Sequence, residues 1–365
     1  MAATDFIGNL AQRYHGTIRF YGAAAFHGLP ETYTFTPDDR GIAVFHVHVD
    51  EAGRFLPRAV DVDQPQLQGT GNPVVTDGSF GPGKIYFGDV HTHSQCSDGR
   101  LPLEQKAREV GLHRGCDFWC LTDHAYDLTT ERLANIRDVL ARVDDSGRFV
   151  TIPGYEWTCT DGHGRACART YYGHRNVHFR DHMTYAADGL APESNTPQAL
   201  AQALADHGRD YVIYNHFHCG ETTSFAGVDE GFEVTSWCGN TVRETSADKA
   251  QYPGVSIAEL FGEGLRGAMV AGSDHGTEAY YTGLPAELTA VHTTALTRDA
   301  VFDALKQGRT YATTGQKVLL AFTVNGTPPG QDQPPVAAAE RRIRVTVGAA
   351  MPIIGIQVMR NGRPW

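Results

Sequence analysis

Hydrophobic and polar positions alternate over three short runs near the start of the chain, at 17–21, 32–36 and 42–49. Successive side chains of a β-strand point to opposite faces of a sheet, so this alternation predicts strands with one wet face. A Gly/Pro-rich stretch at 69–83 ends the segment. We therefore predict a β-rich N-terminal domain over residues 1–84.

From residue 85 to about 314 the pattern changes to apolar strand-like runs that alternate with helical spacing. The strand-like runs lie at 85–90, 117–121, 149–153, 176–179, 211–214, 232–235 and 268–271, and the helical patterns at 103–110, 131–143, 197–207 and 256–265. Alternation of strand and helix indicates a parallel sheet, and this many units favour closure into a barrel. We therefore predict a seven-stranded α/β barrel over residues 85–314.

Residues 315–365 return to β character, with runs at 318–324, 342–347 and 353–358 around a Gly/Pro loop. This pattern favours a small β-sandwich-like C-terminal domain. The predicted organisation is therefore three units, at 1–84, 85–314 and 315–365.

Composition narrows the classes of partner. The 365 residues are 41% hydrophobic and 20% charged, which is typical of a globular protein with a large core. With 42 acidic and 31 basic residues the formal charge is −11, and no Lys/Arg run is present, which argues against nucleic acid as a partner. No stretch suits a signal peptide or a membrane span, and seven irregularly spaced cysteines suit a reducing compartment, so we expect a cytoplasmic protein.

Candidate metal ligands follow most of the strand-like runs at their carboxyl ends. They are His91 and His93, Asp123 and His124, Glu156, His216, and Asp274 with His275, while His174 and His178 bracket the fourth run. The carboxyl ends of barrel strands converge on one cavity, where active sites are built. Imidazole and carboxylate together suit zinc, iron or manganese. The pattern therefore predicts a metal-dependent active site.

A second His-x-His pair, His46 and His48, lies in the N-terminal region. Strict alternation with Phe45, Val47 and Val49 favours a strand with one wet face. We therefore interpret these two as surface histidines rather than ligands.

Several motifs occur in an order that carries a family resemblance: GDVHTHSxxSDG, LTDH, PGYEW, GHRNV, NHFH and GSDHG. The chain resembles the PHP (polymerase and histidinol phosphatase) superfamily of metal-dependent hydrolases, and within it the branch with β-rich flanks that includes a carbamate hydrolase. The segment LTRDAVFDALKQGRTYATTG is similar to the same branch. The resemblance implies an α/β fold with a distorted (β/α)7 barrel between β-rich N-terminal and C-terminal flanking domains.

The resemblance also implies two or three divalent metal ions, which we expect to be Zn, Mn or Fe. It assigns His91, His93 and Asp274 to the first ion, with Glu156 bridging to a second ion held by His216 and by His174, which we prefer to His178. It assigns Asp98, His124 and His275 to the third. The family usually has Asp-x-His where this chain has adjacent Asp274 and His275. Because neighbouring side chains of a regular strand diverge, we expect a local twist there or an altered third site.

Such a centre predicts hydrolysis by a metal-activated hydroxide. Our first hypothesis is a phosphoesterase acting on a small molecule; the alternatives are a carboxylic ester, carbamate or amide hydrolase, and a non-catalytic metal-binding scaffold. Self-association into a homo-oligomer stays open.

Five further side chains are candidates for roles around the ions. His218 is a candidate acid for the leaving group, or else a surface histidine, and Asp123 is expected to orient His124 or a neighbour. Arg175 and Arg180 either bind an anionic substrate or form ion pairs at the barrel rim. Tyr155 either lines a leaving-group pocket or faces the core.

Overall fold

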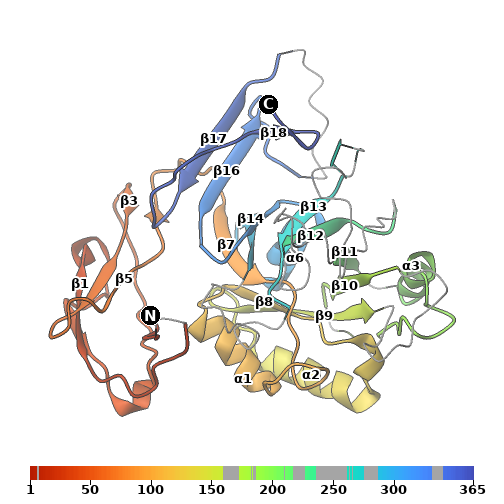
Figure 1. Ribbon diagram of the computed structural model, residues 1–365, viewed down its shortest axis with the longest axis horizontal. Helices are drawn as coiled ribbons and strands as arrows, with labels where there is room; N and C mark the ends of the chain where they lie inside the picture. Colours follow the sequence, from red (N-terminus) through yellow and green to blue (C-terminus); the bar gives the residue numbers. More distant parts are fainter. Residues whose placement is uncertain are drawn as a thin grey trace, which may run out of the picture.

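The computed structural model describes residues 1–5, 8–158, 172–181, 183, 186–208, 210–216, 227–235, 261–262, 264, 266–274, 287–330 and 340–365. Its centre is a nine-stranded sheet with the strand order β13-β12-β11-β10-β9-β8-β7-β14-β15 (Figure 1). The strands are β7 (Lys84–Asp89), β8 (Phe118–Leu121), β9 (Val150–Thr158), β10 (His174–Phe179), β11 (Tyr211–His216), β12 (Gly231–Thr235), β13 (Ala268–Ala271), β14 (Leu288–Thr293) and β15 (Thr310–Thr313).

A strand forms at each of the seven positions predicted for the barrel, from β7 to β13. Parallel pairing joins β7 to β8 and β8 to β9, and joins β11 to β12 and β12 to β13. The expectation of a wholly parallel sheet is wrong at β10, which runs antiparallel to both β9 and β11. The first residue of β10, His174, therefore lies at the edge of the sheet where the strands on either side of it, β9 and β11, end.

The sheet nearly closes on itself at this edge. Just beyond β7 and β13, Thr92 and Asp274 form a parallel bridge, in which the Asp274 amide donates to the His91 carbonyl at 2.8 Å and the His93 amide to the Asp274 carbonyl at 3.0 Å. Elsewhere β14 pairs with β7, and the Thr310 hydroxyl donates to the Met269 carbonyl across β15 and β13. The result is a large, nearly closed, barrel-like sheet within a mixed α/β fold.

Helices cover both faces of this sheet. They are α1 (Leu103–Arg108), which continues into the π-helical turn η3 (Glu109–His113), α2 (Thr130–Val143), α3 (Pro197–Asp206) and α6 (Arg298–Lys306), with a 3-10 turn η4 (Ala125–Asp127). The predicted helices at 103–110, 131–143 and 197–207 are confirmed, and the one at 256–265 falls largely outside the described residues. Threonine hydroxyls at 129, 196 and 297 accept hydrogen bonds from the first turns of α2, α3 and α6, which satisfies amides that have no partner within the helix.

Two apolar cores hold these layers together. On the outer face, Trp119 and Trp157 of the sheet pack with Ile136 of α2 and Leu200 of α3. On the inner face, the apolar side of α6, around Phe302, packs against the sheet in a separate core. Full burial of one such side chain stabilises a fold by about 1.5–3 kcal/mol, so these contacts hold the strands that carry the polar edge.

The N-terminal region contains a four-stranded antiparallel sheet of order β2-β1-β4-β5, at the left in Figure 1. Its elements are β1 (Thr17–Tyr21), η1 (Ala23–Ala25), β2 (Thr32–Thr34), η2 (Pro37–Asp39), β4 (Arg58–Asp61) and β5 (Gln68–Thr70), with β3 (Arg54–Phe55) paired to β6 (Val74–Val75). The predicted strand at 42–49 is wrong, because only Ile42 and His48 make isolated bridges there. The stretch 69–83 is not purely a linker, since it includes β6 and part of β5.

The C-terminal region forms the hairpin of β16 (Leu319–Val324) and β17 (Ile343–Gly348), above the sheet in Figure 1, followed by β18 (Met359–Arg360) and β19 (Arg363–Pro364). The predicted run at 353–358 is not a strand: no strand pairs with it in the described part of the chain, and Ile354 is fully exposed. The domain boundaries at 84/85 and 314/315 stay predictions. No described helix combines the length and the apolar character needed to cross a membrane.

Candidate metal centre

The end of β7 delivers two histidines to the polar edge of the sheet. Asp89 anchors this end: its carboxylate accepts from the Arg114 guanidinium at 2.5 Å and from the Ser273 amide at 3.0 Å. Beyond it, His91 and His93 are both completely buried. A buried imidazole needs a polar partner, so what surrounds these two rings decides their role.

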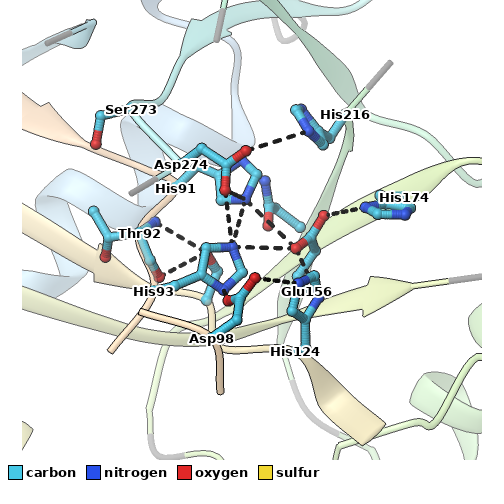
Figure 2. A network of polar contacts seen from close by, with 12 residues as sticks. His91, Thr92, His93, Asp98, His124, Glu156, His174, His216, Ser273 and Asp274 are labelled. Carbon is cyan, nitrogen blue, oxygen red and sulfur yellow. Dashed lines mark hydrogen bonds and ion pairs between the residues drawn. The ribbon is translucent and has the colours of Figure 1, made fainter. Parts of the chain in front are cut away.

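Four ligand atoms from distant parts of the chain converge around one point (Figure 2). The Nε2 atoms of His91 and His93 are 3.1 Å apart. Glu156 Oε2 lies 3.2 Å from His93 Nε2 and 3.6 Å from His91 Nε2, and Asp274 Oδ1 lies at the same two distances. Ligands about 2.0–2.1 Å from a tetrahedral ion are about 3.3–3.4 Å from one another. In their separations from the two imidazole nitrogens, Glu156 and Asp274 are each placed like a ligand of the cation that the two histidines would share.

Glu156 is the centre of a wider group. Its Oε1 lies 2.7 Å from His174 Nδ1, and its Oε2 lies 3.0 Å from His124 Nδ1. His174 reaches it because β10 is antiparallel to β9, with His174 opposite Thr158 and Asn176 opposite Glu156. Ligand atoms of Glu156, His174 and His216 lie within 4.8 Å of one another. The carboxylate of Glu156 is thus placed to bridge two ions.

A third group faces solvent. Asp98 Oδ1 lies 3.2 Å from His93 Nδ1, and Asp98 Oδ2 lies 3.5 Å from His124 Nε2. The Asp98 side chain is 47% exposed, in contrast to the buried ligands behind it. The predicted third partner, His275, lies outside the described residues, as does His218.

The twist expected near Asp274 is present. Asp274 has φ of 67°, a left-handed conformation that is uncommon for residues other than glycine. Its backbone is held there by the bridge to Thr92. Asp274 lies three residues beyond the end of β13, and its left-handed backbone departs from the geometry of that strand.

The electrostatics of the group favour cations. Burial acts on the pKa of Glu156 most strongly and would raise it, but His124, His174 and His91 together hold it well below its usual value. Burial also opposes protonation of His93 and His124, yet the carboxylates around them raise their pKa values to about 9 and about 10. The carboxylates therefore stay ionised and attract positive charge, whether protons or metal ions.

Glu233 of β12 was missed by the sequence analysis. Its carboxylate accepts from His216 Nδ1 at 2.7 Å, from His91 Nδ1 at 3.1 Å and from the Asn176 amide at 2.7 Å. The two distances to Nδ1 are those of hydrogen bonds. These hydrogen bonds orient the rings of His91 and His216 so that Nε2 of each faces the Glu156 group. The available signal was a lone carboxylate inside the apolar run GFEVT, since an isolated charge in a buried strand needs a partner.

Two of the other predicted residues have positioning or packing contacts. Asp123 accepts from the Ser94 amide and hydroxyl and from the Ser97 hydroxyl, each at 2.7 Å, and Ser97 Oγ lies 3.1 Å from His93 Nδ1. Asp123 therefore orients the turn after His93 rather than His124. Tyr155 packs in the outer core beside Phe179, because its side chain points to the opposite face of β9 from Glu156. A pocket-lining role for Tyr155 is wrong.

Both arginines form ion pairs away from the ligands. The fully buried guanidinium of Arg175 contacts Asp229 at 2.7 and 3.1 Å, on the opposite face of β10 from His174. Arg180 follows the far end of β10 and pairs with Asp210 and Asp303 beside α6. The prediction that they bind substrate is therefore not supported, and their contacts match the alternative that they form ion pairs.

Comparison with known proteins gives distant likenesses. A family model described as a protein of unknown function (DUF3604) matches residues 244–326. Uncharacterized proteins of Chlamydia muridarum and Chlamydia trachomatis serovar D are 27% identical over 312 residues and 26% over 311, each match covering 76% of this chain and 48% of the relative. The chain thus spans about half the length of these relatives.

A solved structure from Bacteroides vulgatus is also similar. It is described as a two-domain protein containing a predicted PHP-like metal-dependent phosphoesterase, and it matches with a TM-score of 0.43 and 15% identity over 75% of this chain and 89% of that one. At this level the likeness adds nothing to what the geometry of the His, Asp and Glu cluster itself indicates.

Proposed function

We propose that this protein is a metal-dependent hydrolase, a phosphoesterase acting on a small molecule, built on a distorted (β/α)7 barrel of the PHP kind. The observation that carries the proposal is the approach of one Glu156 oxygen and one Asp274 oxygen to the paired Nε2 atoms of His91 and His93, at 3.2 and 3.6 Å in each case, close to the separation of ligands around one tetrahedral ion. A mixed imidazole and carboxylate set suits zinc, manganese or iron.

The residues divide into three groups of ligands. His91, His93 and Asp274 would hold the first ion, His174 and His216 the second with Glu156 between them, and Asp98 with His124 the outermost. When bound, such ions lower the pKa of water and polarise the oxygen under attack. The protein supplies a dry, fixed frame: every ligand except Asp98 is buried, and Glu233 and Asp123 set the orientation of the histidines and their turn.

The charge of the site supports an anionic substrate only when ions are present. With the histidines neutral, as metal ligands must be, four carboxylates, at 98, 156, 233 and 274, contribute a charge of −4, which would repel a phosphate. Two divalent ions neutralise this charge and three leave the site positive. Asp98 is the exposed ligand, so we place the approach of the substrate on its side of the centre.

The test is hydrolysis of p-nitrophenyl phosphate, bis(p-nitrophenyl) phosphate and p-nitrophenyl acetate by protein loaded with zinc, manganese or iron. We expect metal-dependent cleavage of a phosphate ester that is lost in Asp274→Asn and kept in Glu230→Gln, a half-buried carboxylate that accepts from the Ile213 amide at 2.7 Å. Cleavage of the acetate alone would replace the phosphoesterase by a carbonyl hydrolase. No cleavage of any ester, with metal bound, would reject the hydrolase.

A further inference from the structure

A second group of imidazoles and a carboxylate lies on the N-terminal region, outside the centre described above. His27, after η1, lies opposite His48 in an isolated antiparallel bridge. The two residues exchange both backbone hydrogen bonds, at 2.9 and 3.1 Å. In such a hydrogen-bonded pair the two side chains emerge on the same face of the ladder, a short distance apart. The backbone thus presents two imidazoles side by side.

The rings of this pair are aligned on one neighbour. Their centroids are 4.9 Å apart with an angle of 23° between the planes, so they stack. Both Nε2 atoms point at the same oxygen, Asp50 Oδ2, at 3.4 Å from His27 and 3.6 Å from His48. The convergence of two rings on a single oxygen requires an explanation, because each ring has solvent as an alternative partner.

The distances from the two Nε2 atoms to Asp50 Oδ2 distinguish direct hydrogen bonds from ligands that share one metal ion. An N–H···O hydrogen bond measures 2.7–3.2 Å, and one assisted by charge is shorter still. Ligands about 2.0–2.1 Å from a tetrahedral zinc ion are about 3.3–3.4 Å apart. The two N–O separations are therefore longer than hydrogen bonds and match the separation of ligands around one ion. All three ligand atoms lie within 4.8 Å of one another.

We propose that His27, His48 and Asp50 form a surface site for a divalent transition-metal ion such as zinc, distinct from the Glu156-centred ligands and independent of the hydrolase proposal. Two imidazole nitrogens and one carboxylate oxygen are ligands suited to zinc, copper(II) or nickel. All three side chains are more than half exposed, so water completes the coordination. The ion cross-links the turn after η1 to the segment before β3, where the predicted strand at 42–49 does not form.

The chain provides a matched control. His46 is exposed, as His48 is, and lies two residues away on the same segment, but it does not belong to the group. Substitution of any of these exposed side chains leaves the apolar core of the region, around Ile18 and Phe20, untouched. Circular dichroism of each variant checks that it folds.

The experiment measures zinc bound per chain by equilibrium dialysis and elemental analysis in wild type, His27→Ala, His48→Ala and His46→Ala. Because all four proteins share the Glu156 group, it cancels in the comparison. We expect His27→Ala and His48→Ala to bind one fewer zinc ion, with affinity at this site reduced by more than the roughly 10- to 100-fold that loss of an outer-sphere partner costs. His46→Ala should match wild type.

Copper(II) offers a second readout of the same site. In wild type we expect an electron paramagnetic resonance signal from copper bound by two imidazole nitrogens, which loses one nitrogen in His27→Ala or His48→Ala. Equal zinc stoichiometry and affinity in wild type, His27→Ala and His48→Ala would overturn the proposal, whatever the outcome of the hydrolase assays.

Discussion

Replacement of Glu233 by glutamine tests how the histidines of the centre are oriented. Glu233 receives three donors, from His91 Nδ1, His216 Nδ1 and the Asn176 amide. Burial acts against its ionisation, but the two histidines lower its pKa to about 2, so it is a carboxylate with two accepting oxygens at neutral pH. A glutamine of the same shape has one accepting oxygen and one NH2 donor.

The consequence follows from counting donors. Whichever way the amide of Glu233→Gln is turned, its NH2 faces at least one of the three donors. A buried donor left without an acceptor costs about 1–3 kcal/mol. An imidazole avoids this by moving its proton from Nδ1 to Nε2, the atom that faces the Glu156 group, and then cannot bind a metal ion through it. Both routes weaken metal binding.

The expected magnitude is a 10- to 100-fold loss of affinity, as for other partners that orient a ligand, which is about 1.4–2.7 kcal/mol. Competition with a chromogenic chelator measures it directly, and nitrogen NMR of the histidine rings reports the change of tautomer. Glu230→Gln, three residues away on a carboxylate that accepts from the Ile213 amide, is the control. If Glu233→Gln binds metal within about threefold of wild type, with unchanged tautomers, our reasoning on the orientation of His91 and His216 is wrong.

Three further predictions follow from individual contacts. In Gly272→Ala the added Cβ would lie 2.2 Å from His91 Cβ, so we expect denaturant unfolding to show a loss of stability of about 1–3 kcal/mol, together with weaker metal binding. The control Gly69→Ala, whose Cβ would meet nothing within 4 Å, should be as stable as wild type. Equal stability of the two variants would contradict this prediction. Burial raises the pKa of Glu230 to about 7, so the native state loses stability as pH rises from about 4.5 to 7. Glu230→Gln should therefore be more stable than wild type at pH 8, by about 1–2 kcal/mol after allowance for partial exposure, but not at pH 4. A gain in stability that is the same at both pH values would refute this. Metal affinity should rise with pH between 7 and 9, by about tenfold per unit for each displaced proton, because the raised pKa values of His93 and His124 keep both protonated in the metal-free protein; a flat profile in chelator competition would contradict it.

The strands of the barrel were predictable because their signal is local. Each run from β7 to β13 is a short apolar segment between turn signals, which is visible without knowledge of its neighbours. Strand direction is not local: the antiparallel orientation of β10 depends on pairing with β9 and β11. For the same reason 42–49 and 353–358 have strand-like alternation but no ladder in the described structure. Alternation predicts which faces a strand would have and says nothing of whether a partner exists.

The ligands were predictable to a similar degree. His91, His93, Glu156, His174, His216 and Asp274 come together because strand ends meet at one edge. Arg175 and Tyr155 were misplaced, because a residue beside a ligand in a strand points to the opposite face. Glu233 was missed because it lies inside its strand, at a position that only a closed sheet brings next to His91.

The most direct test of the metal centre is X-ray diffraction from crystals soaked in manganese or zinc, with anomalous difference maps collected at the absorption edge of the metal. We predict an anomalous peak within coordination distance of His91 Nε2, His93 Nε2 and the carboxylates of Asp274 and Glu156, and a second peak on the side of Glu156 that faces His174 and His216. A map without a peak among these four side chains, from crystals in which metal is bound elsewhere on the protein, would contradict the account.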